Sequence, residues 1–313
     1  MGGLGKMPGL GIFGGSRRRG PAVGLCWGSR LALTAVDGLD GEWRLRASHS
    51  DAVADDGDAQ VRTLSRWVSR ARLRRCPAVL TLPPGSYTLT QMERPSVPAE
   101  ELAAAVRWRL RDVLDYPLEE AVTDVFEVPG QGRAGRPPLV YAVAARADPL
   151  RDMVGRAKAA GLQPWKIGIA ELALRNLTER AETGPETVAG VYLMPDRGLV
   201  QITRGDQLFL SRGLDYGLDT LAGAQDPAGL HERVALELQR TMDYYDSHFG
   251  AAPVKRLLVM PGGETVGALA DALGSSLGLA ARVWQVPGAE SQDLESDALL
   301  ALGGALGAPG GRA

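Results

Sequence analysis

The stretch from residue 226 to residue 286 constrains the fold more than any other part of the chain. It opens with Asp226 and Pro227, which suit a helix cap and the first helical position. Apolar side chains then recur at helical spacing, at Leu230, Val234, Leu238, Met242 and Tyr245. Gly250 and Pro253 end this pattern. We therefore predict a long amphipathic helix that packs by one face.

A strand–helix–strand unit follows this helix. Residues 254–260 form a short apolar run of strand composition, residues 264–277 carry a helical pattern, and residues 281–286 resemble another strand. Gly262 and Gly263 lie between the first strand and its helix. In open α/β sheets, ligands bind at the carboxyl ends of strands, where backbone N–H groups and a helix N-terminus face one crevice. The glycine pair is therefore a candidate ligand-binding turn.

The same succession of elements occurs twice in the chain. Three strand patterns, a helix and a further strand begin near residue 21 and again at residue 187. We therefore predict an α/β fold of two lobes that face each other across a cleft, with a small α+β subdomain inserted between them. The expected divisions are a disordered tail (1–20), the first lobe (21–85), the inserted subdomain (86–165), a helix returning to the first lobe (166–186), the second lobe (187–307) and a loose tail (308–313).

Composition excludes several classes of function. The 313 residues suffice for two lobes with cores of their own. The 35 Lys and Arg against 37 Asp and Glu give a formal net charge of −2, which argues against a dedicated nucleic-acid-binding protein. Cys26 and Cys76 have no metal-binding or redox spacing, which indicates a reducing compartment. No apolar run approaches the ~20 residues of a membrane-spanning helix, so we expect a soluble, cytoplasmic protein.

Arginines gather at two places. The triplet of residues 17–19 ends the N-terminal tail, and we interpret it as solvated, with a weak tether to an anionic membrane face as the alternative. A second group lies on the outer side of a helix over residues 61–71 and just after it, at Arg62, Arg66, Arg70, Arg74 and Arg75. We interpret this group as a charged surface whose last arginines complement the helix dipole. A patch for lipid or nucleic acid is the alternative.

No motif for covalent or metal-dependent catalysis is present in the sequence. A Walker-type phosphate loop, a nucleophile elbow and a zinc spacing are all missing. The remaining candidates are three turns at the inner ends of the two lobes, at residues 24–29, 193–198 and 261–264. In a two-lobe nucleotide cleft, the first two turns surround the phosphates and the third lies against the purine.

The element order and residues 254–269 resemble the actin-like ATPase superfamily, which includes actin, Hsp70 and the sugar kinases. Within it, the chain is similar to the PilM/FtsA-like branch. Residues 97–117 resemble the start of its inserted subdomain, and residues 140–174 resemble its strand–helix–Ala-Gly-Leu segment, with Ala-Gly-Leu at residues 160–162. The nearest resemblance is to the MshI family of the mannose-sensitive haemagglutinin (MSHA) pilus system. It is carried by residues 109–117, 171–177 and 236–250. The resemblance covers residues 21–307 and implies an actin-like, ribonuclease H-like fold.

The sequence departs from this family at the residues that hold the nucleotide and its metal ion. The first turn of the family resembles GLDIGSSSVK, whose aspartate helps to hold the metal bound to ATP, whereas Cys26 and Trp27 stand here. A thiol is a poor ligand for Mg²⁺, and we expect the indole to occupy phosphate space. The second turn resembles DIG in the family and is Tyr192-Leu193-Met194 here. The residues that remain for a degenerate nucleotide site are Gly24, Gly28, Ser29, Gly262 and Gly263.

Phosphoryl transfer needs a metal and groups that position the phosphates. We therefore expect a pseudo-ATPase with no catalytic residue, no metal site and no cofactor, and with weak or absent binding of Mg-ATP. An ATP-binding switch or an active ATPase of the same superfamily is the alternative. A further alternative is a cytoplasmic component of a type II secretion system, whose members normally continue into a membrane helix.

The resemblance implies a non-catalytic scaffold for pilus assembly, peripheral to the inner membrane. PilM proteins bind the cytoplasmic tail of the membrane protein PilN in a groove that involves the inserted subdomain. The expected partner here is therefore a PilN-like or MshJ-like tail. The expected contact residues are Pro83, Pro84, Tyr87, Ala104 and Trp108. We expect Trp108 to be a core residue, with a partner-binding anchor as the alternative.

Overall fold

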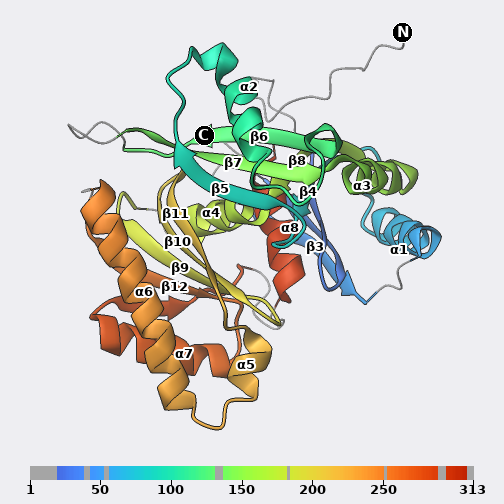
Figure 1. The fold of residues 1–313 in the computed structure, drawn as a ribbon. Helices are drawn as coiled ribbons and strands as arrows, with labels where there is room; N and C mark the ends of the chain where they lie inside the picture. Colours follow the sequence, from blue (N-terminus) through green and yellow to red (C-terminus); the bar gives the residue numbers. More distant parts are fainter. Residues whose placement is uncertain are drawn as a thin grey trace.

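The computed structural model of the protein describes residues 20–38, 43–52, 56–130, 137–181, 184–249, 252–287 and 294–308. The sequence-based predictions for the two tails, including the arginine triplet, lie almost wholly outside these residues. Within the described residues the chain forms three sheets (Figure 1). In the same residues, no helix combines the length and the apolar character that crossing a bilayer demands.

The first sheet combines an antiparallel meander with two parallel strands. Its strands are β1 (Ala22–Trp27), β2 (Leu31–Asp37), β3 (Arg44–Asp51), β4 (Pro77–Leu82) and β8 (Gln163–Ile169), in the order β3-β2-β1-β4-β8. β1 pairs antiparallel with β2 and parallel with β4, which pairs parallel with β8. β1 and β4 are buried along most of their length, which explains why both strands are continuous apolar runs in the sequence.

The second sheet repeats this topology. Its strands are β9 (Thr187–Leu193), β10 (Gly198–Arg204), β11 (Gln207–Leu214), β12 (Val254–Met260) and β13 (Ala280–Val283), in the order β11-β10-β9-β12-β13. β9 takes the place of β1, because it pairs antiparallel with β10 and parallel with β12. The predicted repetition of three strands, a helix and a strand is therefore confirmed.

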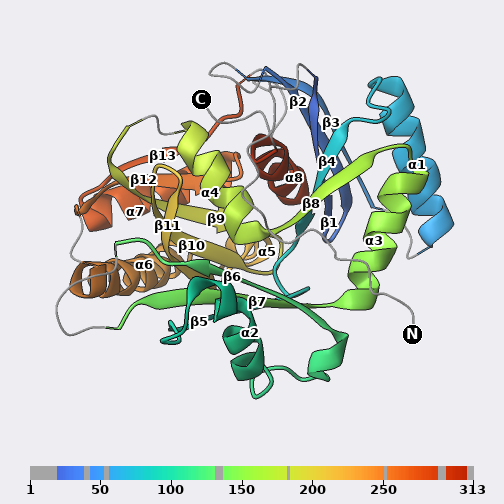
Figure 2. The same cartoon turned by 90° about the horizontal axis from the view of Figure 1, so that it is seen from above.

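Helices cover both faces of the two sheets (Figures 1 and 2). They are α1 (Gly57–Arg70), α3 (Ala147–Ala159), α4 (Ala170–Ala181), α5 (Leu218–Ala222), α6 (Pro227–Phe249), α7 (Glu264–Leu277) and α8 (Ser296–Leu306). α1 and α3 pack on the outer face of the first sheet, and α6 and α7 on the outer face of the second. α4 and α8 lie between the two sheets and share one buried cluster with both (Figure 2).

The inserted subdomain has a sheet of its own, in the order β5-β7-β6. Its elements are β5 (Thr88–Glu93), α2 (Ala99–Leu110), the short 3₁₀ helix η1 (Leu118–Glu120), β6 (Ala121–Glu127) and β7 (Leu139–Arg146). Alternate residues of β7 take opposite faces: Val140 and Ala142 pack under α2, whereas Tyr141 packs against the second lobe and Val143 against the first. The insert is thereby fastened to both lobes.

Two helices lie elsewhere than the sequence-based boundaries imply. α8 falls in the range expected for the second lobe, but it packs chiefly against β1, β2 and α4. The approach is very close, since a Cβ at Gly24 would lie 1.7 Å from the carbonyl oxygen of Ala301. α3 falls in the range expected for the insert, but its buried residues Leu150 and Met153 belong to the cluster beneath the first sheet. Sequence patterns locate such helices without showing which sheet buries them.

Candidate functional site

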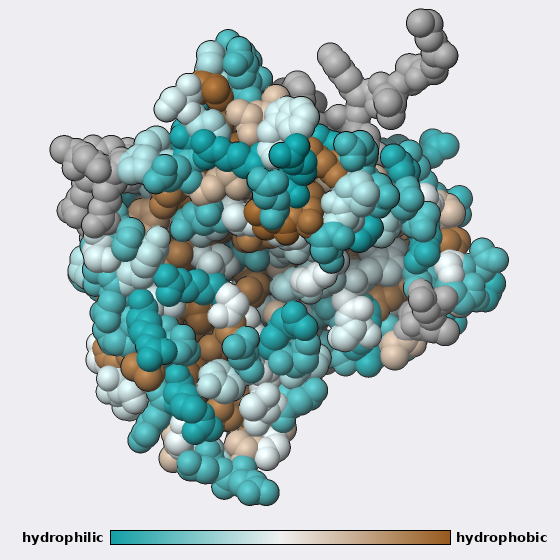
Figure 3. Space-filling view, viewed as in Figure 1, coloured by the Kyte–Doolittle hydropathy of each residue, from teal (hydrophilic) through white to brown (hydrophobic). Residues whose placement is uncertain are grey.

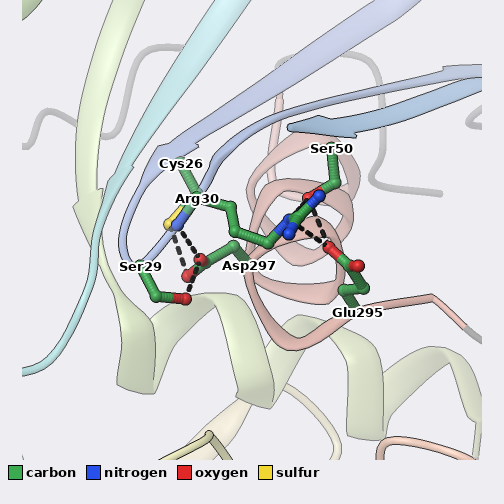
Figure 4. Close-up of polar contacts among 6 residues, drawn as sticks. All are labelled: Cys26, Ser29, Arg30, Ser50, Glu295 and Asp297. Carbon is green, nitrogen blue, oxygen red and sulfur yellow. Dashed lines mark hydrogen bonds and ion pairs between the residues drawn. The ribbon is translucent and has the colours of Figure 1, made fainter. Parts of the chain in front are cut away.

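The turn between β1 and β2 holds a carboxylate of the chain itself (Figure 4). Asp297, the second residue of α8, accepts a hydrogen bond from the backbone N–H of Arg30 at 2.8 Å and from the Ser29 hydroxyl at 2.9 Å, both on Oδ2. The Cys26 thiol lies 3.8 Å from Oδ1. The turn thus has the converging donors of an anion-binding site, and an internal carboxylate engages them.

Gly28 permits this close approach. A Cβ at Gly28 would lie 1.9 Å from Oδ1 of Asp297, far inside contact distance. The Gly28 N–H donates to the carbonyl oxygen of Arg30 at 3.0 Å and closes the turn. Gly28 and Ser29, both predicted to face a phosphate, therefore face the Asp297 carboxylate.

A second, more exposed contact joins the same elements. Nε of Arg30 lies 2.6 Å from Oε2 of Glu295, and the Ser50 hydroxyl donates to the same oxygen at 2.6 Å (Figure 4). The Arg30 and Glu295 side chains are 36% and 50% exposed. Solvent screening therefore limits this ion pair to roughly 0–1 kcal/mol.

Burial governs the charges at the turn. It raises the pKa of the Asp297 carboxyl, and hydrogen bonds from Arg30, Ser29 and Cys26 oppose that shift. Burial also raises the pKa of the Cys26 thiol well above its usual value, and the neighbouring Asp297 carboxylate adds to this shift. Cys26 is therefore a neutral thiol and not a thiolate ligand.

The start of α8 also forms hydrogen bonds with the β9–β10 hairpin of the second lobe. The Ser296 hydroxyl donates to the carbonyl oxygen of Leu193 at 3.0 Å, and the Tyr192 hydroxyl donates to the carbonyl oxygen of Ser296. Ser296 and Asp297, adjacent in sequence, thus tie the β9–β10 hairpin to the β1–β2 hairpin. Asp196, further along the second hairpin, forms an exposed ion pair with Arg197 at 2.7 Å.

The third predicted turn begins α7. Gly263 has a φ of 122°, in the region where glycine alone is at ease, and its carbonyl oxygen accepts the Gly267 N–H at 2.9 Å. In the described part of the chain, no hydrogen bond joins Gly262 or Gly263 to the β1–β2 turn. Gly24, predicted to belong to the first phosphate turn, lies inside β1 beneath α8 and not in the β1–β2 turn itself.

The predicted position of the Trp27 indole is also wrong. Successive side chains of a strand take opposite faces, so Cys26 faces α8 while Trp27 packs on the outer side of the first sheet. Its Nε1 donates to Oε1 of Gln60 in α1 at 3.0 Å. The side chain that approaches the turn is Asp297, which sequence reasoning missed. An acid in the first turn of a helix is so common that it gives no signal of a contact 268 positions away.

The predicted partner-binding residues fall into two groups. Pro83, Pro84 and Tyr87 follow β4 and are partly buried, and the Tyr87 hydroxyl donates to the buried Glu171 carboxylate. Ala104 and Trp108 lie on the exposed face of α2. Tyr87 packs with the first-sheet cluster, while α2 packs on the insert's own sheet. Figure 3 shows a mainly hydrophilic face with hydrophobic residues gathered below α2, beside β5.

Trp108 is 66% exposed, so the expectation that it is a core residue is wrong. The face of α2 opposite Trp108 buries Leu102, Val106 and Leu110 against the insert's sheet. The Arg111 guanidinium lies 5.9 Å from the centroid of the Trp108 ring. An exposed indole beside a cation suits contact with another chain.

Other features of the described residues add no second catalytic candidate. No group of three or more His, Cys, Asp or Glu side chains there could hold a metal ion. A cavity of about 440 Å³ lies beside α5 and the start of α6, lined by residues between Tyr216 and Arg233. It contains none of the predicted site residues.

Neither family models nor curated protein sequences give a match to this chain. Solved structures do match. The PilM–PilN type IV pilus biogenesis complex aligns with a TM-score of 0.69 at 21% identity, over 92% of this chain and 98% of the other. The cytoplasmic domain of EpsL, an inner-membrane component of the type II secretion system of Vibrio cholerae, gives 0.52 at 14% identity, over 92% and 96%.

A third structure points to the same class. A Bacteroides thetaiotaomicron protein with an actin-like ATPase fold aligns with a TM-score of 0.51 at 7% identity, over 90% of this chain and 96% of the other. At such identities the likeness establishes the fold alone. This chain has the actin-like ATPase fold, as its sequence predicted.

Proposed function

We propose that this chain is a non-catalytic, actin-like scaffold that docks the cytoplasmic tail of an inner-membrane protein in a pilus assembly. The observation that carries the non-catalytic part is the Asp297 carboxylate on the β1–β2 turn. A phosphate at this turn would need the same donors, Ser29 Oγ and Arg30 N–H, that Asp297 engages. Two negative groups at one small set of donors repel each other strongly in a partly buried site.

The residues around the turn do not fit Mg-ATP. Mg²⁺ requires hard oxygen ligands, and Cys26 offers a neutral, buried thiol. The second hairpin presents Tyr192, whose hydroxyl is engaged by Ser296.

One observation favours the rival, an ATP-binding switch. The Asp297 carboxylate lies beside Cys26, and Cys26 stands where the related proteins have an aspartate. On this second hypothesis Asp297 supplies the missing acid from another element. The two hypotheses give opposite results in one experiment.

That experiment is a thermal-shift titration with Mg-ATP on the wild type and on Asp297→Asn. A ligand that binds only the folded state stabilises it by about 2.7 kcal/mol at a hundredfold excess over its Kd. We expect an unchanged melting temperature for the wild type. A rise of several degrees that disappears in Asp297→Asn would establish the rival hypothesis instead.

The structural likeness to the PilM–PilN complex supports the docking part of the proposal. On this chain we place the tail-binding site between residues 83–87 and the outer face of α2, with Trp108 as its anchor. Exposed aromatic side chains of this kind dominate many interfaces. We propose an MshI-like role with a MshJ-like partner, so that the protein is cytoplasmic and held at the inner membrane through that partner.

The docking site is tested with a peptide of the cytoplasmic tail of a single-span protein encoded beside this gene. Trp108→Ala is expected to weaken peptide binding by tenfold or more, because a buried interface tryptophan typically contributes about 2 kcal/mol or more. Leu236→Ala is the matched control, since Leu236 is also exposed, at 50%, but lies on α6. Equal affinity of Trp108→Ala and wild type would remove α2 from the site.

The likeness to the EpsL cytoplasmic domain favours a second assignment, to a type II secretion system. Both assignments use the same docking surface and differ in the partner. Co-purification from the native host separates them. A pilus protein of the PilN type supports the first assignment, and secretion components alone support the second.

A further inference from the structure

Five cationic side chains gather at one edge of the first sheet, which we call the basic edge. They are Arg70, Arg72, Arg74, Arg75 and Lys158, and all five residues are exposed. The four arginines come from the end of α1 and the turn that leads into β4, and Lys158 comes from the last turn of α3.

The two turns lie side by side because β4 and β8 are neighbouring parallel strands that start together, with Pro77 opposite Gln163. The backbone N–H of Arg75 donates to the carbonyl oxygen of Gly161 at 2.7 Å, which joins the α1–β4 turn to the α3–β8 turn. The Arg74 side chain passes over Gly161. Two segments far apart in sequence therefore form one cationic surface.

The α1–β4 turn holds its arginines in an unusual backbone conformation. Arg72 and Arg75 have φ values of 56° and 61°, a left-handed region that disfavours side chains with a Cβ. Leu73 between them is fully buried and fixes the turn. Glycine or asparagine would suit these two positions better, and residues strained in this way cluster at functional sites of proteins.

The end of α1 does not need these arginines as caps. Arg46 of β3 donates to the carbonyl oxygen of Ala71 through Nε at 3.2 Å and Nη2 at 3.1 Å, and its Nη1 lies 3.2 Å from the Asp37 carboxylate. The backbone N–H groups of Arg72 and Leu73 satisfy the carbonyls of Ser69 and Val68. Among the described residues, no ion pair or side-chain hydrogen bond engages the five cations of the basic edge.

We propose that the basic edge binds the anionic headgroups of a phospholipid membrane. Guanidinium groups match phosphate oxygens in geometry and charge. The aromatic side chain nearest in sequence to the four arginines, Trp67, is buried and stacks on His49, so the α1–β4 turn itself offers no exposed ring on which a nucleic-acid base could stack. The net charge of −2 also disfavours nucleic acid.

The proposal rests on the proposed function in one respect, namely that tail docking brings the protein to a membrane. β4 connects the two surfaces, because it starts at the basic edge with Pro77 and ends at Leu82, just before Pro83. Its six residues span about 20 Å at roughly 3.3 Å per residue. The partner's tail would therefore extend about one strand length from the bilayer to its docking site.

The test is co-flotation with vesicles of phosphatidylcholine alone and of phosphatidylcholine mixed with phosphatidylglycerol. We expect binding only to the anionic vesicles, and its loss at high salt. The triple variant Arg72→Gln, Arg74→Gln, Arg75→Gln is expected to bind about a hundredfold more weakly, at about fivefold per cation. Its circular dichroism and melting temperature establish that it folds, and the corresponding triple lysine variant should retain most of the binding.

The matched control removes three cations from the second lobe, with Arg233→Gln, Arg240→Gln and Lys255→Gln, and should float like the wild type. The proposal is overturned if wild type binds both vesicles equally, if the basic-edge and control variants behave alike, or if duplex DNA competes better than anionic vesicles. Measuring the affinity of each variant for the tail peptide in solution separates membrane binding from the proposed tail docking. The basic-edge variant should keep the peptide affinity, and Trp108→Ala should keep the vesicle affinity.

Discussion

The carboxylate of Asp297 gives the β1–β2 turn a permanent anion. Ser29, Arg30 and Cys26 each direct a donor toward it, and Gly28 leaves room for it. A mobile phosphate pays an entropic cost to occupy such a turn, whereas a side chain on a packed helix is already in place. The internal contact thus stabilises the position of α8 against the β1–β2 turn.

Asp297→Ala tests this contact at the residue scale. The substitution leaves the Ser29 hydroxyl and the Arg30 N–H without their acceptor, so we expect the free energy of unfolding to fall by about 1–3 kcal/mol. The two freed donors should then bind inorganic phosphate. Added phosphate should therefore raise the melting temperature of Asp297→Ala but not that of the wild type. Glu295→Ala is the control, and its exposed ion pair should cost less than about 1 kcal/mol. If phosphate stabilises both the wild type and Asp297→Ala, or neither of them, Asp297 does not occupy an anion-binding turn.

Glu171 predicts a pH dependence of stability. Burial raises the pKa of its carboxyl above the ordinary value of 4.5, and the hydrogen bond from Tyr87 opposes this shift. Because the folded pKa is the higher one, the contribution of Glu171 is full below the ordinary pKa and is lost as pH rises through the folded value. We therefore expect the free energy of unfolding of Glu171→Gln, minus that of the wild type, to increase as pH rises through this window, as measured by urea denaturation. Parallel curves for the two proteins would show that Glu171 does not titrate in this way.

At the scale of elements, α8 depends on small residues on both sides of its contacts. Gly24 of β1 lies against Ala301, and Gly303 of α8 lies against Ala173 of α4. Added side chains there have no space, because backbone atoms of neighbouring elements fill it. This packing places the start of α8, and with it Asp297, at the turn.

Glycine-to-alanine substitutions test this packing. Gly24→Ala and Gly303→Ala place a Cβ 1.7 Å and 2.2 Å from the carbonyl oxygens of Ala301 and Ala173, and overpacking should destabilise each by about 1–3 kcal/mol or more. Gly155→Ala is the matched control, because Gly155 is exposed in α3 with nothing within 4 Å of the new Cβ. It should stabilise the protein by about 0.5–1 kcal/mol. Chemical denaturation measures all three, and equal effects would show that the contacts of α8 are not tight.

Sequence patterns were sufficient for elements and insufficient for their contacts. Periodic apolar residues placed α6, and turn residues placed β12 and α7, because these signals are local. The glycines and alanines of α8 indicated close packing but not the partner of the helix, which lies some 270 residues earlier in the chain. The prediction that Trp108 is a core residue was wrong for the same reason. α2 buries only one of its faces, and the sequence does not show which elements surround the insert.

At the scale of the whole molecule, shared clusters join the three sheets. The first and second sheets share the cluster around α4 and α8, and the insert contributes Tyr141 and Val128 to the cluster of the second lobe. The Tyr141 hydroxyl also accepts the backbone N–H of Ser211 at 3.1 Å. Each of the three sheets therefore shares at least one buried cluster with a neighbouring part of the described chain.

Scanning calorimetry tests this coupling. Chains of this size often unfold in steps, but the shared clusters predict one transition with equal van't Hoff and calorimetric enthalpies. Asp297→Ala should lower the temperature of that transition without splitting it. Two resolved peaks in the wild type would show that the lobes unfold independently.

The place of α8 along the chain has a consequence for biosynthesis. Both sheets precede α8 in the sequence, yet α8 completes, together with α4, the layer between them. A ribosome that has not yet passed residue 306 holds a chain whose two sheets still expose their inward apolar faces. Such a nascent chain would be a natural client for chaperones until the last layer is translated.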